Sequence, residues 1–128
     1  ITKWSSYPEF VSEVNNIVGD YGLNILIHNS GLFFSRVKTI EDVVGQELYL
    51  NFNVNTIGPI LLTQSLLPLL RQGAEVNKSE PFGPKRAAIY YISSNLASIQ
   101  GNVEGGYWGY RESKVIIFFI FFTVLYYT

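Results

Sequence analysis

The sequence predicts an α/β fold with a parallel sheet, because two short apolar runs are separated by a long stretch of helical periodicity. The runs are residues 23–28 and 87–92, and small polar residues end each of them. Runs this short are typical of strands. Two strands joined through helices form a βαβ unit with parallel strands and a right-handed crossover. We therefore expect both strands to be buried in a doubly wound sheet.

Apolar spacing also predicts the helices before and after the first strand. Residues 8–18 carry apolar side chains at helical intervals, and Gly19 and Gly22 follow them. Thr39 and Asp42 resemble a capping box and are expected to start a helical region that continues through position 48.

A longer helix is expected from Asn53 to about Arg71, with a bend or a break at Pro59 and Pro68. Residues 72–86 are rich in glycine, proline and charge, so a surface loop is expected there.

Composition narrows the classes of function. The 128 residues are 48% hydrophobic, which is enough for one packed domain. With a net charge of -1, the chain lacks the excess of positive charge that nucleic-acid-binding proteins use to attract phosphates. No cysteine and a single histidine, His28, leave no typical metal site. Without a signal peptide, the expected location is the cytoplasm, with no membrane partner.

Small polar residues follow both predicted strands. Asn29, Ser30 and Gly31 follow the first strand, and Ser93 and Ser94 follow the second. Ligands of open parallel sheets bind beyond the carboxyl ends of the strands, so both groups are expected on one rim. The same residue types also form ordinary turns, and the topology alone leaves both interpretations open.

Tyr110 and Lys114 form a third candidate group at the start of a predicted helix. Residues four apart share a helix face, so the phenol and the ammonium are neighbours. A nearby cation favours the phenolate and brings the phenol towards general-acid strength at neutral pH. The spacing recurs by chance in a tyrosine-rich chain. The pair is treated as a candidate site because it follows the second predicted strand and a glycine-rich loop.

Several ordered motifs then carry a family resemblance. They are His28-Asn29-Ser30-Gly31, Asn53-Val54-Asn55-Thr56, Leu66-Leu67-Pro68-Leu69-Leu70, Ile92-Ser93-Ser94, Ser98-Ile99-Gln100-Gly101-Asn102 and Tyr110-Arg111-Glu112-Ser113-Lys114. Over residues 1–114 the chain resembles the short-chain dehydrogenase/reductase family, in particular its sniffer-type carbonyl reductase branch, which is close to the bacterial C-factor proteins. The resemblance implies a Rossmann-type doubly wound sheet, of which the chain carries the central βαβ portion without the first βαβ half.

The resemblance also implies a reaction, in which NADPH reduces a small-molecule carbonyl substrate. Tyr110 would donate the proton, Ser94 would hold the carbonyl oxygen, Lys114 would favour the phenolate and contact the nicotinamide ribose, and Asn55 would position a relay water. Ser93 and Ser98 remain possible substitutes for Ser94, because Ser94 lies sixteen residues before Tyr110, further than usual. The implied cofactor-binding residues are Asn29, Ser30, Gly31, Tyr110 and Lys114. The complete protein is expected to be a homo-oligomer.

Three departures from the family pattern shape the expectation for the chain itself. No glycine-rich nucleotide loop is present, His28 replaces an asparagine, and residues 115–128 form an uncharged apolar tail that favours a strand over a helix. We expect a fragment, comprising a partial catalytic domain at 1–114 and an aberrant tail, that binds no NADPH alone. The alternatives are a catalytically inactive fragment and an interaction module that uses the exposed tail.

Overall fold

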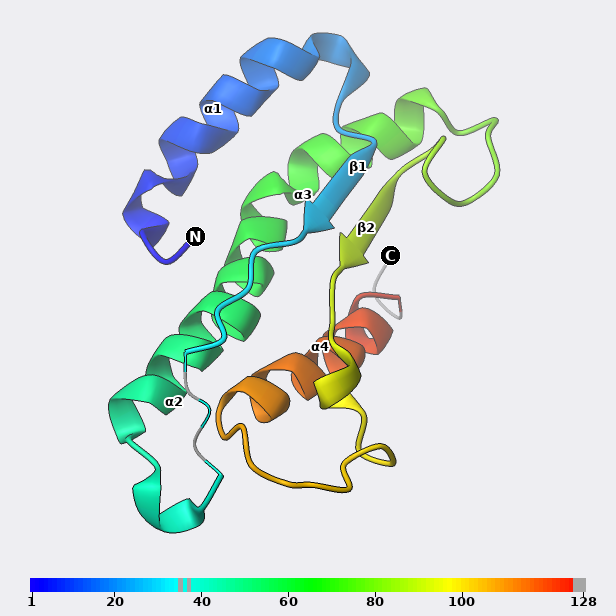
Figure 1. Cartoon of the computed structure of the whole chain (residues 1–128). Helices are drawn as coiled ribbons and strands as arrows, with labels where there is room; N and C mark the ends of the chain where they lie inside the picture. Colours follow the sequence, from blue (N-terminus) through cyan, green and yellow to red (C-terminus); the bar gives the residue numbers. More distant parts are fainter. Residues whose placement is uncertain (35, 37, 126–128) are drawn as a thin grey trace. The chain divides into compact units, whose positions relative to one another are not determined.

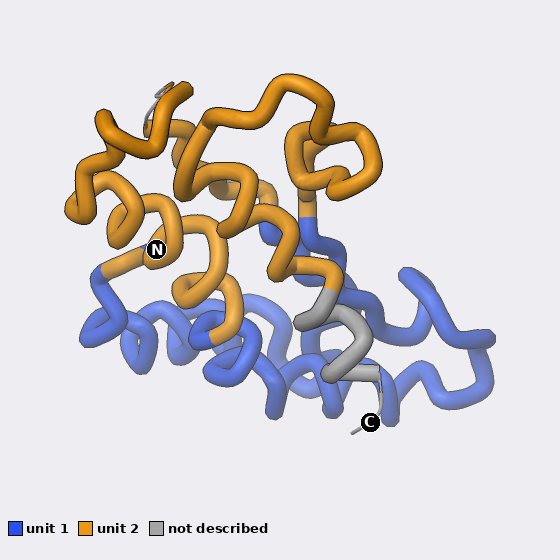
Figure 2. The backbone as a smooth tube through the Cα atoms, turned by 90° about the horizontal axis from the view of Figure 1, so that it is seen from below, with its two compact units in different colours: residues 1, 3–28, 61–91 blue, residues 2, 29–60, 92–128 orange. Residues whose placement is uncertain are grey.

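A computed structural model describes residues 1–125 except positions 35 and 37, and the side chains of those residues up to position 118. The chain divides into two compact units (Figure 2). Unit 1 comprises residues 3–28 and 61–91 together with residue 1, and unit 2 comprises residues 29–60 and 92–128 together with residue 2.

Unit 1 contains a sheet of two parallel strands. β1 (Ile25–His28) pairs with β2 (Ala88–Tyr91), in a register that places Ile25 opposite Ala88 and His28 opposite Tyr91 (Figure 1). Helices lie between the two strands in the sequence, so the predicted βαβ connection and the α/β fold class are confirmed. Each strand is two residues shorter than its apolar run, which is the usual uncertainty of element ends.

Two helices supply the core of unit 1. α1 (Tyr7–Val18) begins with Pro8 in its first turn and ends at Gly19, as the sequence predicts. α3 (Gly58–Val76) contributes buried leucines from its middle. The core comprises Leu66, Leu69 and Leu70, with Val11, Val14, Val18, Leu23, Leu26, Leu62 and Ile89 packed against them.

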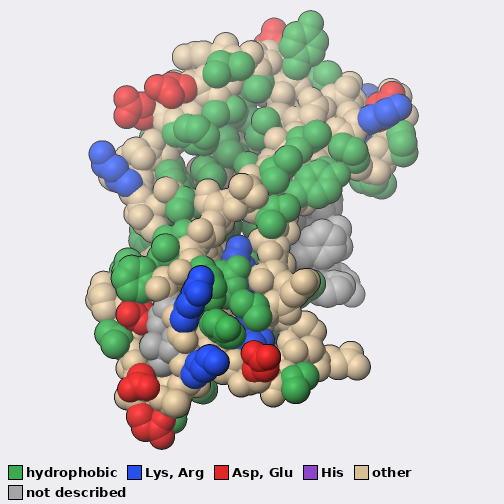
Figure 3. All heavy atoms as spheres, viewed as in Figure 1, with side chains coloured by type: hydrophobic (Ala, Val, Ile, Leu, Met, Phe, Trp, Pro, Cys, Tyr) green, Lys and Arg blue, Asp and Glu red, His purple; other side chains and the backbone are tan. Residues whose placement is uncertain are grey.

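The expected burial of both strand faces is wrong for β1. Leu26 packs against the core, whereas Ile25 and Ile27 on the opposite face are 42% and 57% exposed. Tyr90 of β2 is also exposed, and Figure 3 shows apolar side chains at the surface in this view. A continuous apolar run does not reveal how many layers cover a strand. In unit 1 helices α1 and α3 supply the core that covers Leu26.

α3 extends five residues beyond its expected end, into the predicted loop. Gly73 lies inside this helix and lets it approach the segment before β1, where the Leu23 N–H donates to the Leu69 carbonyl at 2.8 Å. A Cβ at position 73 would lie 2.4 Å from the Leu23 carbonyl oxygen. Pro68 does not interrupt the helix. The glycine therefore marks close packing and not a turn.

Unit 2 contains the helical segments between residues 40 and 57. A 3-10 turn (Ile40–Asp42) precedes α2 (Gly45–Phe52), and the chain continues through a π-helical turn (Asn53–Ile57) into α3. The π turn ends at Ile57 and α3 begins at Gly58, so the chain is helical through Pro59 and the expected break there does not occur. Thr39 donates its hydroxyl proton to the Asp42 carboxylate at 2.6 Å and does not cap a backbone N–H, so α2 begins later than predicted.

α4 (Tyr110–Leu125) begins at the residue where the sequence predicts a helix. It continues through the apolar tail to Leu125, so the expected strand preference of the tail is wrong up to that residue. Positions 126–128 lie outside the described residues. Once a helix is nucleated, each further residue adds a hydrogen bond. Ile117 of this helix is also buried. Among the helices described, none has the length and apolar character needed to cross a bilayer.

His28 ends β1 inside a buried polar chain. Its Nε2 lies 2.8 Å from the Thr63 hydroxyl, which lies 2.8 Å from the Tyr91 hydroxyl, and the His28 and Tyr91 rings stack at 4.6 Å. Only 5% of His28 is exposed, and this burial lowers its pKa to about 4. The imidazole is therefore neutral near pH 7. Its contacts with Thr63 and Tyr91 all lie within unit 1.

We predict that His28 makes the chain sensitive to mild acid. Unfolding restores an ordinary imidazole, so the group costs no stability above pH ~6.5 and progressively more as the pH falls towards 4, up to about 3 kcal/mol. Urea unfolding of the wild type and of His28→Gln between pH 7 and 4 measures this cost. The stability difference between them should change steadily over that range. Parallel pH curves for the two proteins would contradict the prediction.

Candidate active site

Lys114 ties α4 to the segment that follows β2. Its Nζ donates to the Ile92 carbonyl at 3.0 Å, and the Ser93 hydroxyl donates back to the Lys114 carbonyl at 3.3 Å. Lys114 is 4% exposed, and this burial lowers the pKa of its ammonium. These two hydrogen bonds join the two residues before Ser94 to α4 one helical turn after Tyr110.

Gly31 gives the Lys114 ammonium the space that it occupies. A Cβ at position 31 would lie 3.1 Å from Lys114 Nζ and 3.7 Å from the Asn55 Oδ1. Any larger residue would push against a buried cation with little room to move. The sequence singled out Gly31 as part of a polar strand end, and its geometric role is this spacing.

Asn55 joins three segments of unit 2. Its side chain is 1% exposed; its Oδ1 accepts from the Leu32 N–H at 2.7 Å, and its Nδ2 donates to the Leu32 carbonyl at 2.8 Å and to the Ser113 hydroxyl at 2.9 Å. Thr56 donates to the Ser113 carbonyl at 2.9 Å. The π-helical turn is thus fixed to both α4 and the segment after β1. Such turns occur frequently at functional sites.

Tyr110 faces the same segment as Lys114. Its ring packs on the ring of Phe33, with the two centroids 4.5 Å apart. Phe33 lies two residues after Gly31. No described residue forms a hydrogen bond with the Tyr110 hydroxyl. Just before it, Tyr107 has a φ of 56°, a strained value for a residue with a side chain. The first turn of α4 is therefore anchored while its phenol stays unbonded within the described part of the chain.

The three candidate serines differ in how their hydroxyl protons are used. Ser93 donates its proton to Lys114, and the exposed Ser98 accepts from the Gly101 N–H at 3.0 Å. Ser94 accepts from the Leu96 N–H at 3.2 Å, and no described residue receives its proton. Ser94 and Ser98 thus both keep a donor within the described residues, and they differ in that Ser98 is exposed whereas Ser94 is partly buried.

No protein-family model matches the chain. Among curated proteins, the C-signal of Myxococcus xanthus is 30% identical over 95 residues, which cover 74% of this chain and 50% of that protein. Short-chain dehydrogenase srdF of Neurospora crassa is 30% identical over 116 residues, covering 75% of this chain and 45% of the relative.

Solved structures give a stronger likeness. Carbonyl reductase Sniffer of D. melanogaster has 40% sequence identity and a TM-score of 0.85, over 89% of this chain and 46% of that one. The NADPH-bound carbonyl reductase from chicken fatty liver has 31% identity and a TM-score of 0.80, over 93% of this chain and 46% of that one.

The chain belongs to the short-chain dehydrogenase/reductase family. Its two parallel strands and their helices form part of the Rossmann-type fold of that family. The chain spans about half the length of the relatives that it matches.

Among the candidate residues, the structure brings Asn55, Gly31 and Lys114 together. Tyr110 packs against Phe33, and Ser94 follows the residue that is bonded to Lys114. Asn29 and Ser30 are exposed, and no described residue forms a hydrogen bond with their side chains.

Sequence reasoning missed two residues that hold the site in place. Ser113 connects Asn55 to α4, and Arg111 binds three carbonyl groups of the preceding loop. Each lies inside the Tyr-x-x-x-Lys pattern, where it looks like an ordinary helix residue. The only sequence signal for Arg111 is its place beside a glycine-rich loop, whose free carbonyl groups need donors.

Proposed function

We propose that Ser94, Tyr110 and Lys114 form the proton-donating part of a site that reduces a small-molecule carbonyl with NADPH. The observation that supports this most directly is the pair of hydrogen bonds between Lys114 and residues 92–93. They keep the serine segment, the buried ammonium and the first turn of α4 in one place.

NADPH, when bound, supplies the hydride to the carbonyl carbon. Tyr110 would give its phenolic proton to the carbonyl oxygen, which together with the hydride yields an alcohol. Lys114 would place a positive charge one helical turn away from Tyr110. Ser94 donates its hydroxyl proton in a hydrogen bond to the carbonyl oxygen, where negative charge develops in the transition state.

Lys114 fits its proposed contact with the nicotinamide ribose. An ammonium has three N–H donors, and among the described residues only the Ile92 carbonyl accepts one of them. Gly31 has no side chain that would displace the ammonium from this position. Two donors thus remain for ribose hydroxyl groups. The exposed Asn29 and Ser30 adjoin this space in sequence, which agrees with a cofactor-binding role.

The hydrogen bonds of the Asn55 side chain bear on how it would position a relay water. Its amide already uses its two N–H donors and its oxygen in hydrogen bonds within the protein. We therefore propose that a relay water binds to a backbone carbonyl of the π-helical turn, and that the Asn55 amide shapes that turn. The relay water would then need no hydrogen bond from the Asn55 side chain.

The sequence contains no binding loop for the pyrophosphate of the cofactor, because no glycine-rich loop follows a strand and begins a helix. We propose that the 128-residue chain supplies the catalytic residues and does not bind NADPH by itself. Saturable quenching or enhancement of NADPH fluorescence by the chain at micromolar concentrations would contradict this.

A chimaeric enzyme tests the proposed function. Residues 1–118 would replace the aligned segment of the D. melanogaster Sniffer protein, and NADPH consumption would be followed with an aromatic aldehyde. We expect reduction, and a loss of about 10² in kcat on Ser94→Ala. Ser93→Ala should cost less, because it removes an anchor and no reacting contact. A folded chimaera that binds NADPH without reducing the aldehyde would refute the proposal.

A further inference from the structure

An extended loop separates the two proposed proton donors. Fifteen residues lie between Ser94 and Tyr110, and most of the stretch from 98 to 104 is exposed. Apart from the short 3-10 turn at Asn95–Ala97, the loop has no helix or strand. A loop this long needs internal anchors, because its free movement would carry Ser94 away from the first turn of α4.

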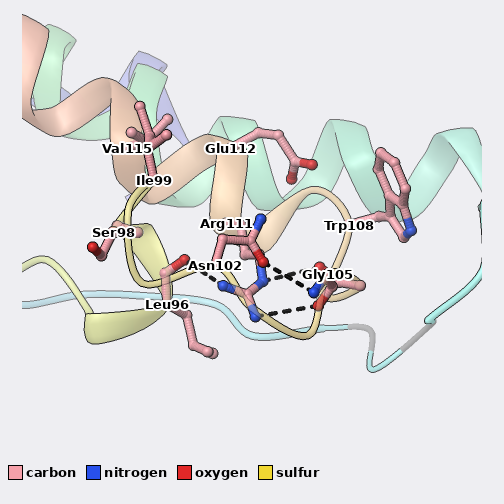
Figure 4. Close-up of a pocket in the computed structure, with 11 residues that line it drawn as sticks. Leu96, Ser98, Ile99, Asn102, Gly105, Trp108, Arg111, Glu112 and Val115 are labelled. Atoms are coloured by element: carbon pink, nitrogen blue, oxygen red, sulfur yellow. Dashed lines mark hydrogen bonds between the residues drawn. The ribbon is translucent and has the colours of Figure 1, made fainter.

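Arg111 binds both ends of this loop. Its Nη1 donates to the Leu96 carbonyl at 3.1 Å, its Nη2 to the Gly105 carbonyl at 3.2 Å and its Nε to the Gly106 carbonyl at 3.1 Å. Figure 4 shows the guanidinium between Leu96 and Gly105, with dashed lines to both. Arg111 is itself the second residue of α4, so three hydrogen bonds close the loop onto the helix.

Leu96 connects this arginine to the serine. The residue whose carbonyl Arg111 binds is also the one whose N–H donates to the Ser94 hydroxyl at 3.2 Å. Fixing the carbonyl of Leu96 restricts the rotation of its backbone, and this keeps its N–H aimed at Ser94. The chain of contacts thus runs from the helix that carries Tyr110 to the hydroxyl group of Ser94.

We propose that Arg111 is a positioning residue, which closes the extended loop and orients Ser94 through the Leu96 backbone. Its catalytic importance rests on the proposed function of Ser94.

The guanidinium has a geometry that a lysine lacks. Arg111 is 9% exposed and forms no ion pair with a described residue, so its place does not depend on a carboxylate. The Tyr107 ring lies beneath it, 5.3 Å from the guanidinium carbon. A planar fork can reach carbonyls at opposite ends of the loop at once, whereas an ammonium is a compact point donor.

Hydrogen exchange of the full 128-residue chain tests the proposal. In Arg111→Lys the Leu96 amide should exchange about threefold to tenfold faster than in the wild type, the effect of losing roughly one net hydrogen bond. Amides of β1 should keep their rates, which separates a local effect from a loss of global stability. Unchanged Leu96 exchange in a folded variant would overturn the proposal.

Arg86→Lys is the matched control. Arg86 also donates to a backbone carbonyl, that of Ala74 at 3.2 Å, and also lies over an aromatic ring, that of Phe82. It belongs to unit 1, so its replacement should leave the Leu96 amide unchanged. Equal acceleration in both variants would show that loss of any arginine loosens the loop, and it would reject the specific role of Arg111.

A measurement on the wild-type chain covers the case in which Arg111→Lys fails to fold. Three hydrogen bonds should slow the rotation of the Arg111 guanidinium, so its Nη protons should give separate NMR signals that differ from those of the exposed Arg71. A single averaged signal for Arg111 would reject the proposal that its three hydrogen bonds close the loop.

The chimaeric enzyme separates this proposal from the proposed function. If Ser94 is catalytic, Arg111→Lys should lower kcat more than it changes the KM for NADPH. If the chimaera is inactive although Leu96 exchange depends on Arg111, the proposed function fails and the positioning of Ser94 stands. Loss of NADPH affinity alone would contradict the positioning of Ser94.

Discussion

Tyr110→Phe in the chimaeric enzyme is expected to lower kcat for aldehyde reduction by about 10²- to 10⁴-fold, because the proton donor is lost. The ring keeps its contact with Phe33, so folding should be unaffected. The Kd for NADPH should change little, since Lys114 and Gly31 are unchanged. Steady-state kinetics and fluorescence titration measure the two effects separately.

Tyr107→Phe is the matched control for that substitution. It removes a phenolic hydroxyl from the residue three positions earlier, whose ring also packs near Phe33, with centroids 5.6 Å apart. We expect kcat to remain within about twofold of the parent, because that hydroxyl takes no part in the proposed proton transfer. Equal losses from both substitutions would mean that Tyr110 acts through packing and not as an acid.

Gly73→Ala should destabilise unit 1 by about 2–3 kcal/mol. The new Cβ would lie 2.4 Å from the Leu23 carbonyl oxygen and 2.8 Å from its carbon, so the backbone must move. That movement would also strain the hydrogen bond from the Leu23 N–H to the Leu69 carbonyl. Thermal or urea unfolding measures the loss.

Gly45→Ala provides the comparison for that effect. Gly45 is the first residue of α2, and a Cβ there would meet no atom within 4 Å. The substitution should leave the stability unchanged or raise it by about 0.5 kcal/mol, through a less flexible unfolded chain. If Gly73→Ala were as harmless as Gly45→Ala, the close approach of α3 to the segment before β1 would be wrong.

The sequence predicted the order of elements because periodicity and end signals are local properties. α1, the parallel pairing of β1 with β2, and the start of α4 at Tyr110 were all predictable in this way. The end of α3 was not, because Gly73 reads as a loop signal and only the position of Leu23 shows its packing role. The helical continuation of α4 into the tail also depends on context, since β-branched and aromatic residues favour strands in isolation.

For the site, the sequence identified the residue types and the structure showed what holds them. The separation of Tyr110 from Lys114 by one helical turn follows directly from their spacing. The fully bonded amide of Asn55 could not be predicted, because its partners are the Leu32 backbone and Ser113, which lie far from it in the sequence. Arg111 was missed for a different reason, since its acceptors are backbone carbonyls and carry no side-chain signature.

Transfer of deuterium tests the central proposal most directly. The chimaeric enzyme would be incubated with an aromatic aldehyde and NADPH deuterated at C4, using the two C4 epimers in separate reactions. With one of the epimers we expect an alcohol that carries one deuterium on its carbinol carbon, and almost no such product from the Tyr110→Phe variant. An alcohol free of deuterium with both epimers, or equal labelling by the Tyr110→Phe variant, would contradict hydride transfer assisted by Tyr110.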